Sequence, residues 1–252
     1  MHTRGKIGPV SDDRAPDGVV RVRAPNPSPL TLDGTNTYVV GGWVVDPGPD
    51  DDGHLDRVSD TVSRAAPDGS AEGIVLTHDH ADHAEGAPAL AVRLGGVPVV
   101  RPGEGDDVGP FRALATPGHA PDHVCLLFGR ILFSGDTVLG QGSVFIGPGE
   151  GSMSAYLASL RRLSKLDLQT LCPGHGPFVW RPREKIDAYL EHRLDRERWL
   201  LEALAAGART RDQMLDAAWP EVPRALRSAA GLTLEAHLEK LGEEGRLPEG
   251  VA

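Results

Sequence analysis

The chain has 252 residues, with 26 Lys and Arg against 36 Asp and Glu, two Cys and a formal net charge of −10. This length suffices for one large or two modest domains, and no apolar run approaches the roughly 20 residues that a membrane helix needs. The acidic balance disfavours duplex DNA as a partner, since binding through phosphates requires a basic face. The cysteine spacing fits no disulfide framework, and the first residues lack the apolar segment of a signal peptide, so we expect a cytoplasmic protein.

Residues 1–18 are polar and rich in Gly, Pro and Asp, and we expect a flexible N-terminus. Short strand-like runs then alternate with helical stretches, a pattern typical of a layered α/β domain, which we place at 19–182. Gly41-Gly42 and Gly129-Arg130 each separate two such runs and predict hairpin turns. The expected strands are 19–22, 37–40, 43–45, 73–77, 98–100, 124–128, 131–133 and 168–172, and the expected helices are 55–66, 84–94 and 153–163.

The character of the chain changes after Pro182. Helices are predicted at 184–206, at 210–218 with Thr210 as its cap, and at 226–244, and Gly245-Arg246-Leu247 could start a small strand. This order predicts a small helical, winged-helix-like domain over 183–252. The segment holds 11 basic and 14 acidic residues, so packing on the core or forming a homodimer is favoured over DNA binding.

The strongest chemical signal is the pattern H-x-H-x-D-H, formed by His78, His80, Asp82 and His83. It directly follows an apolar strand, so a loop at the strand end can aim several side chains in one direction. Imidazole nitrogen and carboxylate oxygen are good ligands for first-row metals, and no thiolate is nearby to select a softer ion. The pattern therefore predicts a metal site.

Three further residues follow strands and lie in Gly-rich turns, namely His119, Asp136 and His175. Each is weak evidence when taken singly. With the first four they make five His and two Asp, enough for two metals that share a carboxylate at the roughly 3.5–4 Å spacing of hydrolytic two-metal sites.

This ordered series resembles the metallo-β-lactamase superfamily. The resemblance implies a four-layered αββα sandwich with the site at one edge between the two sheets. It also implies two Zn²⁺ per chain, with manganese or iron as alternatives, and a ligand for every position of the series. By this resemblance His78, His80 and His119 hold the first ion, Asp82, His83 and His175 hold the second, and Asp136 bridges them.

Residues that differ among the subfamilies of this superfamily indicate which subfamily the chain resembles most. Asp136 stands where β-lactamases of this superfamily commonly carry Cys or another residue, and His80 stands where redox di-iron relatives carry Glu. Residues 32–38, 117–124 and 133–142, with the helix after Pro182, resemble the β-lactamase-like protein 2 group. That group carries a C-terminal winged-helix-like region, and its animal member is described as an endoribonuclease acting on single-stranded RNA.

Several residues outside the candidate ligand set allow either a structural or a functional interpretation. Asp46 ends an early strand and either supports a ligand loop or only forms a turn. His123 has either a structural role or a role toward substrate. The helix positions Tyr189, His192 and Arg193 share one face, which either binds an anionic substrate or is a solvated surface.

These features predict a dinuclear metal-dependent hydrolase that uses a metal-bridging hydroxide on an ester, thioester or lactone. Asp82 is the candidate catalytic residue, because a ligand that touches the nucleophile can accept its proton. The first alternative is a single-stranded RNA endoribonuclease, and the second is a non-catalytic, metal-stabilised binding protein. The expected partner is accordingly a small molecule or single-stranded RNA, with no duplex DNA and no membrane.

Overall fold

The computed structural model describes residues 14–149 and 151–248, which fall into two units. The first comprises 14–115, 122–143 and 167–182, and the second comprises 116–121, 144–166 and 183–248. The chain changes unit after residues 115, 121, 143, 166 and 182, so residues 116–121 and 144–166 fall in the second unit although the predicted 19–182 domain includes them. Most of the expected flexible N-terminus, residues 1–13, lies outside the described residues.

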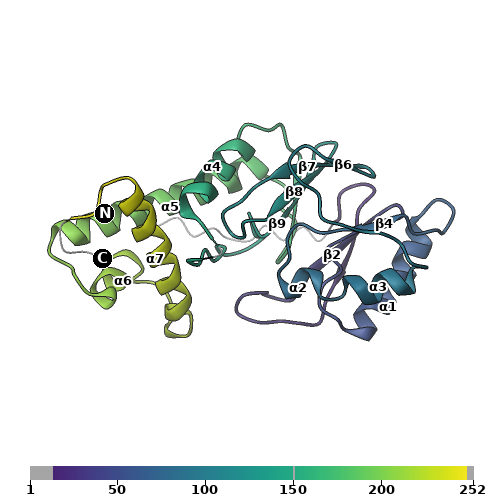
Figure 1. The fold of residues 1–252 in the computed structure, drawn as a ribbon, viewed down its shortest axis with the longest axis horizontal. Helices are drawn as coiled ribbons and strands as arrows, with labels where there is room; N and C mark the ends of the chain where they lie inside the picture. Colours follow the sequence, from purple (N-terminus) through teal and green to yellow (C-terminus); the bar gives the residue numbers. More distant parts are fainter. Residues whose placement is uncertain (1–13, 150, 249–252) are drawn as a thin grey trace. The chain divides into compact units, whose positions relative to one another are not determined.

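The first unit contains a five-stranded sheet in the order β1-β2-β3-β4-β5 (Figure 1). Its strands are β1 (Val20–Arg23), β2 (Asn36–Val40), β3 (Trp43–Val45), β4 (Gly73–Val75) and β5 (Val99–Val100). The predicted hairpin is confirmed, because β2 and β3 pair antiparallel across Gly41, whose φ is +56°. Strands β3, β4 and β5 are parallel, so their carboxyl ends meet at one edge.

The second sheet of this unit has the order β10-β9-β8-β7-β6. Its strands are β6 (Asp107–Val108), β7 (Phe111–Ala115), β8 (Val124–Phe128), β9 (Ile131–Gly135) and β10 (Thr170–Pro173). The β8–β9 hairpin was expected, and β10 pairs parallel with β9. Strands β6 and β7 were not expected from the sequence, since only Phe111 in them is a large, fully buried apolar residue.

The helices of the first unit are α1 (Asp52–Ala65), α2 (Ala81–Ala84) and α3 (Ala87–Arg93). The single helix expected over 84–94 is wrong, because the chain breaks between α2 and α3 at Gly86. A Cβ at Gly86 would lie 2.8 Å from the carbonyl oxygen of Pro49 and 2.9 Å from Leu55 Cδ2. The Gly86 N–H donates to the Gly48 carbonyl at 2.9 Å instead of to the preceding helical turn, and Pro88 has no N–H to donate, so the helix is interrupted here.

Two apolar clusters build this unit. Helices α1 and α3 cover one face of the first sheet, where Leu55, Val58 and Leu90 pack on Val44 and Ile74. The opposite face packs on the second sheet through a shared cluster. That cluster includes Tyr38, Val45, Val75, Phe111, Leu126, Phe133, Cys172 and Phe178. Two stacked sheets with helices confirm the predicted α/β architecture.

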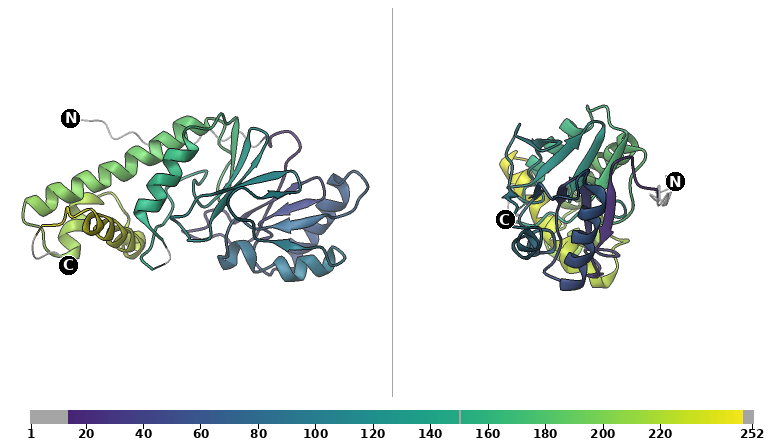
Figure 2. Two further views of the ribbon diagram at one scale, coloured as in Figure 1. Left: turned by 45° about the horizontal axis from the view of Figure 1, so that its top comes forward. Right: turned by 90° about the vertical axis from the view of Figure 1, so that its right-hand side faces the viewer.

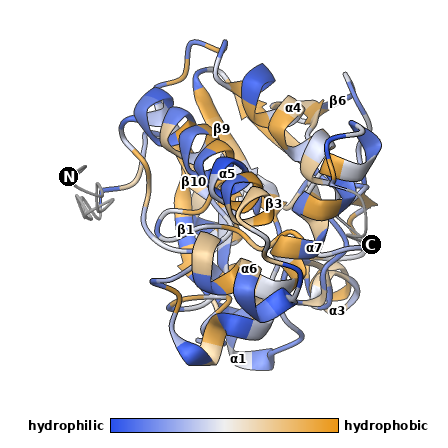
Figure 3. Cartoon of the chain, turned by 90° about the vertical axis from the view of Figure 1, so that its left-hand side faces the viewer, coloured by the Kyte–Doolittle hydropathy of each residue, from blue (hydrophilic) through white to orange (hydrophobic). Residues whose placement is uncertain are grey.

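The second unit is helical, with α4 (Met153–Leu163), α5 (Pro182–Ala205), α6 (Arg211–Ala218) and α7 (Arg227–Glu243). The long helix α5 stands out in Figure 2, and in Figure 3 it carries both hydrophilic and hydrophobic residues along its length. Thr210 caps α6 as predicted, in a capping box with Gln213. The apolar core of the helical part includes Leu200, Leu204, Leu215, Trp219, Leu234 and Leu241.

The small strand expected at Gly245-Arg246-Leu247 is wrong. Gly245 has a φ of +65°, and the backbone N–H groups of Gly245 and Arg246 donate to the carbonyls of Gly242 and Leu241. These residues cap the C-terminus of α7, where a left-handed glycine is favoured. In the part of the chain that the structure describes, no helix combines the length and apolar character needed to cross a membrane.

His237 on α7 is an unusual member of the helical interior. Its side chain is fully buried, and neither ring nitrogen has a hydrogen-bond partner among the described residues. Burial, together with the neighbouring charges of Arg193, Lys240, His192 and Arg196, lowers the pKa of His237 to about 3. The imidazole is therefore neutral in the folded protein near neutral pH.

We expect acid to destabilise the second unit. The unfolded His237 binds a proton near pH 6.5 and the folded one only near pH 3, so stability is present above pH 6.5 and is lost as pH falls toward 3. Between pH 7 and pH 5 the protonation of His237 alone lowers the free energy of unfolding by about 2 kcal/mol. Urea unfolding at both pH values, followed by tryptophan fluorescence, measures this loss. His237→Phe should reduce it, and an equal loss in that variant would contradict the assignment.

Candidate metal centre

The predicted ligands of the first unit follow the ends of its strands. His78, His80, Asp82 and His83 come after β4, and the last two lie in the short helix α2. Asp136 directly follows β9, and His175 comes two residues after β10. Parallel pairing of β9 with β10, and of β3 with β4, brings carboxyl ends together at common edges.

Two imidazoles and two carboxylates converge within this unit. The Nε2 atoms of His83 and His175 are 3.3 Å apart. Asp82 Oδ2 lies 3.2 Å from His175 Nε2 and 3.6 Å from His83 Nε2. Asp136 Oδ2 lies 3.4 Å from His175 Nε2, and Asp136 Oδ1 lies 3.5 Å from His83 Nε2.

These distances fit a divalent metal ion. Metal–ligand bonds of about 2.0–2.1 Å in tetrahedral geometry separate the ligand atoms by about 3.3–3.4 Å. The ligand atoms of Asp82, His83 and His175 lie within 4.8 Å of one another, and so do those of His78, His83 and Asp136. The donors are nitrogen and oxygen only, a set that suits first-row divalent metals.

The electrostatics of this cluster pair anionic carboxylates with imidazoles. Burial raises the pKa of Asp136, but His175 and His83 lower it more, and the net pKa lies well below its usual range. Burial lowers the pKa of His175, yet Asp136 and Asp82 raise it to about 9. The same competition leaves the pKa of His83 well above its usual value, with Asp136 and Asp46 as the raising partners. The carboxylates thus supply the negative charge that a bound cation would balance.

Asp46 organises the backbone and side chains behind this cluster. It is buried, with 2% exposure, and its φ of +49° places it in the left-handed region that few non-glycine residues adopt. Its Oδ1 accepts from the Thr77 N–H at 2.7 Å. Its Oδ2 accepts from the Thr77 hydroxyl at 2.7 Å and from His83 Nδ1 at 2.9 Å. Asp46 therefore both forms a turn and supports a ligand loop.

These bonds fix which imidazole nitrogens carry a proton. A carboxylate only accepts, so His83 Nδ1 must donate to Asp46. Thr77 gives its single hydroxyl proton to Asp46, so at 2.9 Å it accepts from His78 Nδ1. In the neutral form of both rings the Nε2 atoms present their lone pairs, as metal binding requires.

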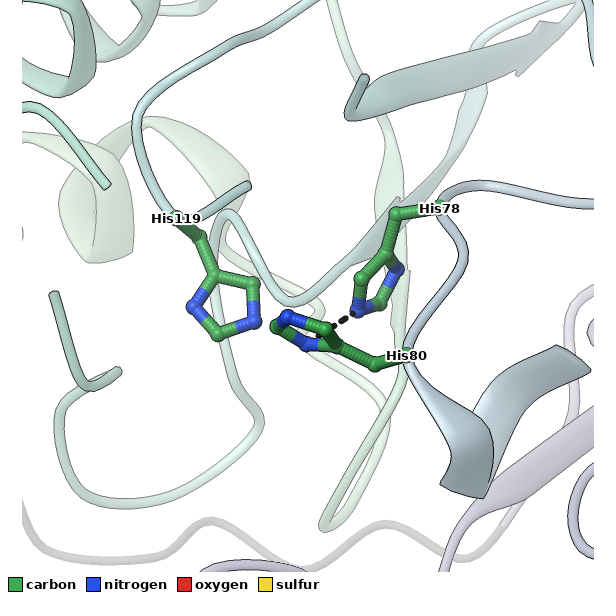
Figure 4. A group of neighbouring side chains, drawn as sticks. All are labelled: His78, His80 and His119. Carbon is green, nitrogen blue, oxygen red and sulfur yellow. Dashed lines mark hydrogen bonds between the residues drawn. The ribbon is translucent and has the colours of Figure 1, made fainter. Parts of the chain in front are cut away.

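His78 and His80 meet in the loop after β4, where His78 Nε2 lies 3.1 Å from His80 Nδ1 (Figure 4). The third side chain drawn in Figure 4, His119, belongs to the second unit. There its Nδ1 donates to the Phe145 carbonyl at 2.8 Å, which leaves Nε2 as the acceptor nitrogen. Its loop packs on α4, because the Ser159 hydroxyl donates to the Pro117 carbonyl at 2.8 Å.

At two glycines the backbone lies very close to side chains of the candidate ligand cluster. A Cβ at Gly174 would lie 2.4 Å from Asp136 Oδ1 and 2.6 Å from His83 Cε1. A Cβ at Gly135, whose φ is +44°, would lie 2.7 Å from Thr77 Oγ1. Any side chain at either position would displace a candidate ligand or its support.

The helix face of Tyr189, His192 and Arg193 is not the solvated surface that the sequence analysis held as an alternative. Tyr189 and Arg193 are each 2% exposed within the second unit. The Arg193 guanidinium donates to the Val144 carbonyl and lies 5.4 Å from the centre of the Tyr156 ring. Burial, together with Arg193 and Arg196, lowers the pKa of His192 to about 3. A role of this face toward substrate stays a prediction.

One supporting residue was missed from the sequence. His54 on α1 is fully buried, and its Nε2 lies 3.0 Å from both Thr37 Oγ1 and the Pro47 carbonyl. It therefore holds the turn that follows Asp46. A lone His in an amphipathic helix carries no sequence signal that distinguishes this role from surface exposure.

Two known families match parts of the chain. The family described as "Metallo-beta-lactamase superfamily" matches residues 93–175. The family described as "Beta-lactamase associated winged helix domain" matches residues 210–249 and confirms the predicted winged-helix region.

Relatives with names align over most of the chain. A Caenorhabditis elegans protein named beta-lactamase-like protein 2 homolog is 30% identical over 262 residues, which covers 92% of this chain and 87% of the relative. An Aspergillus chevalieri protein named atrochrysone carboxyl ACP thioesterase is 32% identical over 221 residues, which covers 79% of this chain and 70% of the relative.

Solved structures share the fold. A beta-lactamase domain protein from Burkholderia ambifaria has a TM-score of 0.75 at 21% identity and covers 92% of this chain and 88% of its own. A second protein, solved in a di-iron-bound form, has a TM-score of 0.53 at 28% identity and covers 66% of this chain and 96% of its own.

We expect Asp46→Asn to weaken metal binding. The Asn amide retains an acceptor for the Thr77 N–H but cannot accept from both the Thr77 hydroxyl and His83 Nδ1. Loss of such a supporting bond typically costs about 10- to 100-fold in metal affinity. Competition with a chromophoric chelator measures the affinity, and Asp60→Asn on the exposed side of α1 is the control. Equal affinities in both variants would exclude this role for Asp46.

Proposed function

Because the chain belongs to the metallo-beta-lactamase superfamily, we propose that it is a dinuclear metal-dependent hydrolase of thioesters and related small esters or lactones. The observation that carries this proposal is the convergence of Asp82, His83, Asp136 and His175 in one unit, at distances that fit a metal ion. With His78, His80 and His119 the candidate ligands number seven, more than the four around which a purely structural zinc site closes.

In this proposal His78, His80 and His119 hold one ion, Asp82, His83 and His175 hold the other, and Asp136 serves both. Zinc suits these nitrogen and oxygen donors, and manganese or iron are alternatives. The relative solved in a di-iron-bound form supports two ions in this fold. When bound, the ions would lower the pKa of a shared water and stabilise negative charge on the attacked group.

The chain's own residues position the reaction. Asp46 and Thr77 keep His78 and His83 in the Nδ1–H form, so that their Nε2 atoms face the cluster. Asp82 is the residue that accepts a proton, since its side chain is 32% exposed and opens to solvent. Burial raises the pKa of Asp82, but His175 and His83 lower it more, so its carboxylate is ionised at neutral pH.

Thioesters are the favoured substrate class because a relative 32% identical to this chain is named as an acyl-carrier-protein thioesterase. A net charge of −10 also favours a small or locally docked substrate over a long polyanion. We place the reaction in the cytoplasm, with no role for duplex DNA.

A second candidate is endoribonuclease activity on single-stranded RNA. It is supported by the winged-helix match at 210–249 and by relatives named beta-lactamase-like protein 2 homolog. A third candidate, a non-catalytic metal-stabilised binding protein, would need the same ligands but no turnover.

A substrate panel distinguishes these candidates. Protein loaded with Zn²⁺ or Mn²⁺ is incubated with acyl thioesters, lactones, bis-p-nitrophenyl phosphate and single-stranded RNA, and elemental analysis is run on the same preparation. We expect two metal equivalents and fastest turnover of a thioester. Cleavage of RNA alone would favour the second candidate, and two bound ions without turnover of any substrate would favour the third.

We also expect Asp136→Asn to reduce activity by about two orders of magnitude or more, because the amide removes the negative charge shared by both ions. Circular dichroism should be unchanged, since apolar clusters form the core. Asp107→Asn, an exposed change in the same unit, is the matched control. Two tightly held ions with near-native turnover in Asp136→Asn would show that Asp136 does not serve both.

A further inference from the structure

A buried histidine outside the proposed ligand set, His123, lies directly behind Asp136. It is 1% exposed and immediately precedes β8 in the first unit. The backbone N–H of Asp136 donates to His123 Nε2 at 3.1 Å. On its other side, His123 Nδ1 lies 3.2 Å from Thr137 Oγ1.

The direction of these bonds follows from the donors present. A backbone N–H can only donate, so His123 Nε2 must be the unprotonated nitrogen. The neutral ring then carries its proton on Nδ1 and donates it to Thr137 Oγ1. One imidazole thus holds two consecutive residues of the turn that presents the Asp136 carboxylate.

The turn at Gly135 packs tightly against the His123 ring. A Cβ added at Gly135 would lie 2.6 Å from His123 Nε2, so only glycine lets the turn approach the ring this closely. On the other side, the His123 and His78 rings have centroids 4.9 Å apart at 31°. His123 therefore separates a proposed ligand after β4 from the turn after β9 by the thickness of one ring.

We propose that His123 is a positioning residue, which sets the place of the Asp136 backbone and through it the carboxylate shared by the two ions. The inference rests on the proposed function, because it concerns the same metal centre. Without the His123 acceptor the buried N–H of Asp136 loses its partner, a loss that a turn relieves by moving. Movement of this backbone changes the distances from the Asp136 carboxylate to the imidazoles of His83 and His175.

Two isopolar substitutions test the bond itself. In His123→Gln the side-chain oxygen reaches the place of Nε2 and can accept from the Asp136 N–H. In His123→Asn the shorter side chain reaches only the place of Nδ1. We expect His123→Asn to weaken metal binding by about 10- to 100-fold at one or both ions, and His123→Gln to stay within a few-fold of wild type. Chelator competition and the visible spectrum of the Co²⁺-loaded protein report these changes.

Thermal unfolding of the metal-free proteins separates positioning from general destabilisation. Phe111→Leu, a change in the core between the sheets, should lower the unfolding temperature while metal affinity and the Co²⁺ spectrum stay at wild-type values. Thr137→Val removes only the partner of Nδ1 and should fall between His123→Gln and His123→Asn.

The outcomes distinguish the positioning role of His123 from the proposed function. If wild type binds two ions and His123→Asn binds them with unchanged affinity and spectrum, the positioning role is wrong and the proposed function stands. If Phe111→Leu weakens metal binding as much as His123→Asn at the same loss of stability, the effect is one of stability and the inference is again overturned. A wild-type protein that binds no divalent ion would overturn both.

Discussion

A single buried carboxylate, that of Asp46, links the strand ends on which the candidate metal centre depends. It joins the turn after β3 to Thr77, two residues after β4, and to His83 in α2. Three accepted hydrogen bonds balance the cost of burying its charge and its left-handed backbone. These bonds, and the one from His78 to Thr77, orient the imidazoles of His83 and His78 without any bound ion.

The sheets provide the rigid frame for this arrangement. The ligands of the first unit follow β4, β9 and β10, whose apolar residues pack together in the cluster between the two sheets. Short loops on such a frame can hold side chains in place, whereas long loops could not. The region after Pro182 has its own apolar core around Trp219 and Leu234, and its family match treats it as a separate module.

Much of this candidate centre could be predicted from the sequence, because its His and Asp residues form an ordered pattern and most of them follow a strand that the sequence indicates. The supporting residues could not be predicted in the same way. Asp46 was equally consistent with a simple turn, and His54 had no signal at all, since both act through tertiary contacts. The face of Tyr189 and Arg193 reads as amphipathic and solvated, yet the structure buries it, because guanidinium groups can pack on aromatic rings and backbone carbonyls.

The glycine at position 174 has a consequence for how this centre can change. Its missing side chain leaves the space that Asp136 Oδ1 and His83 Cε1 occupy. Even one added methyl group at this position would force Asp136 or His83 to move, so sequence changes that keep the two side chains in place have to occur at other positions. A mutational scan would find this plain residue, which offers no chemistry of its own, as intolerant of replacement as the histidines beside it.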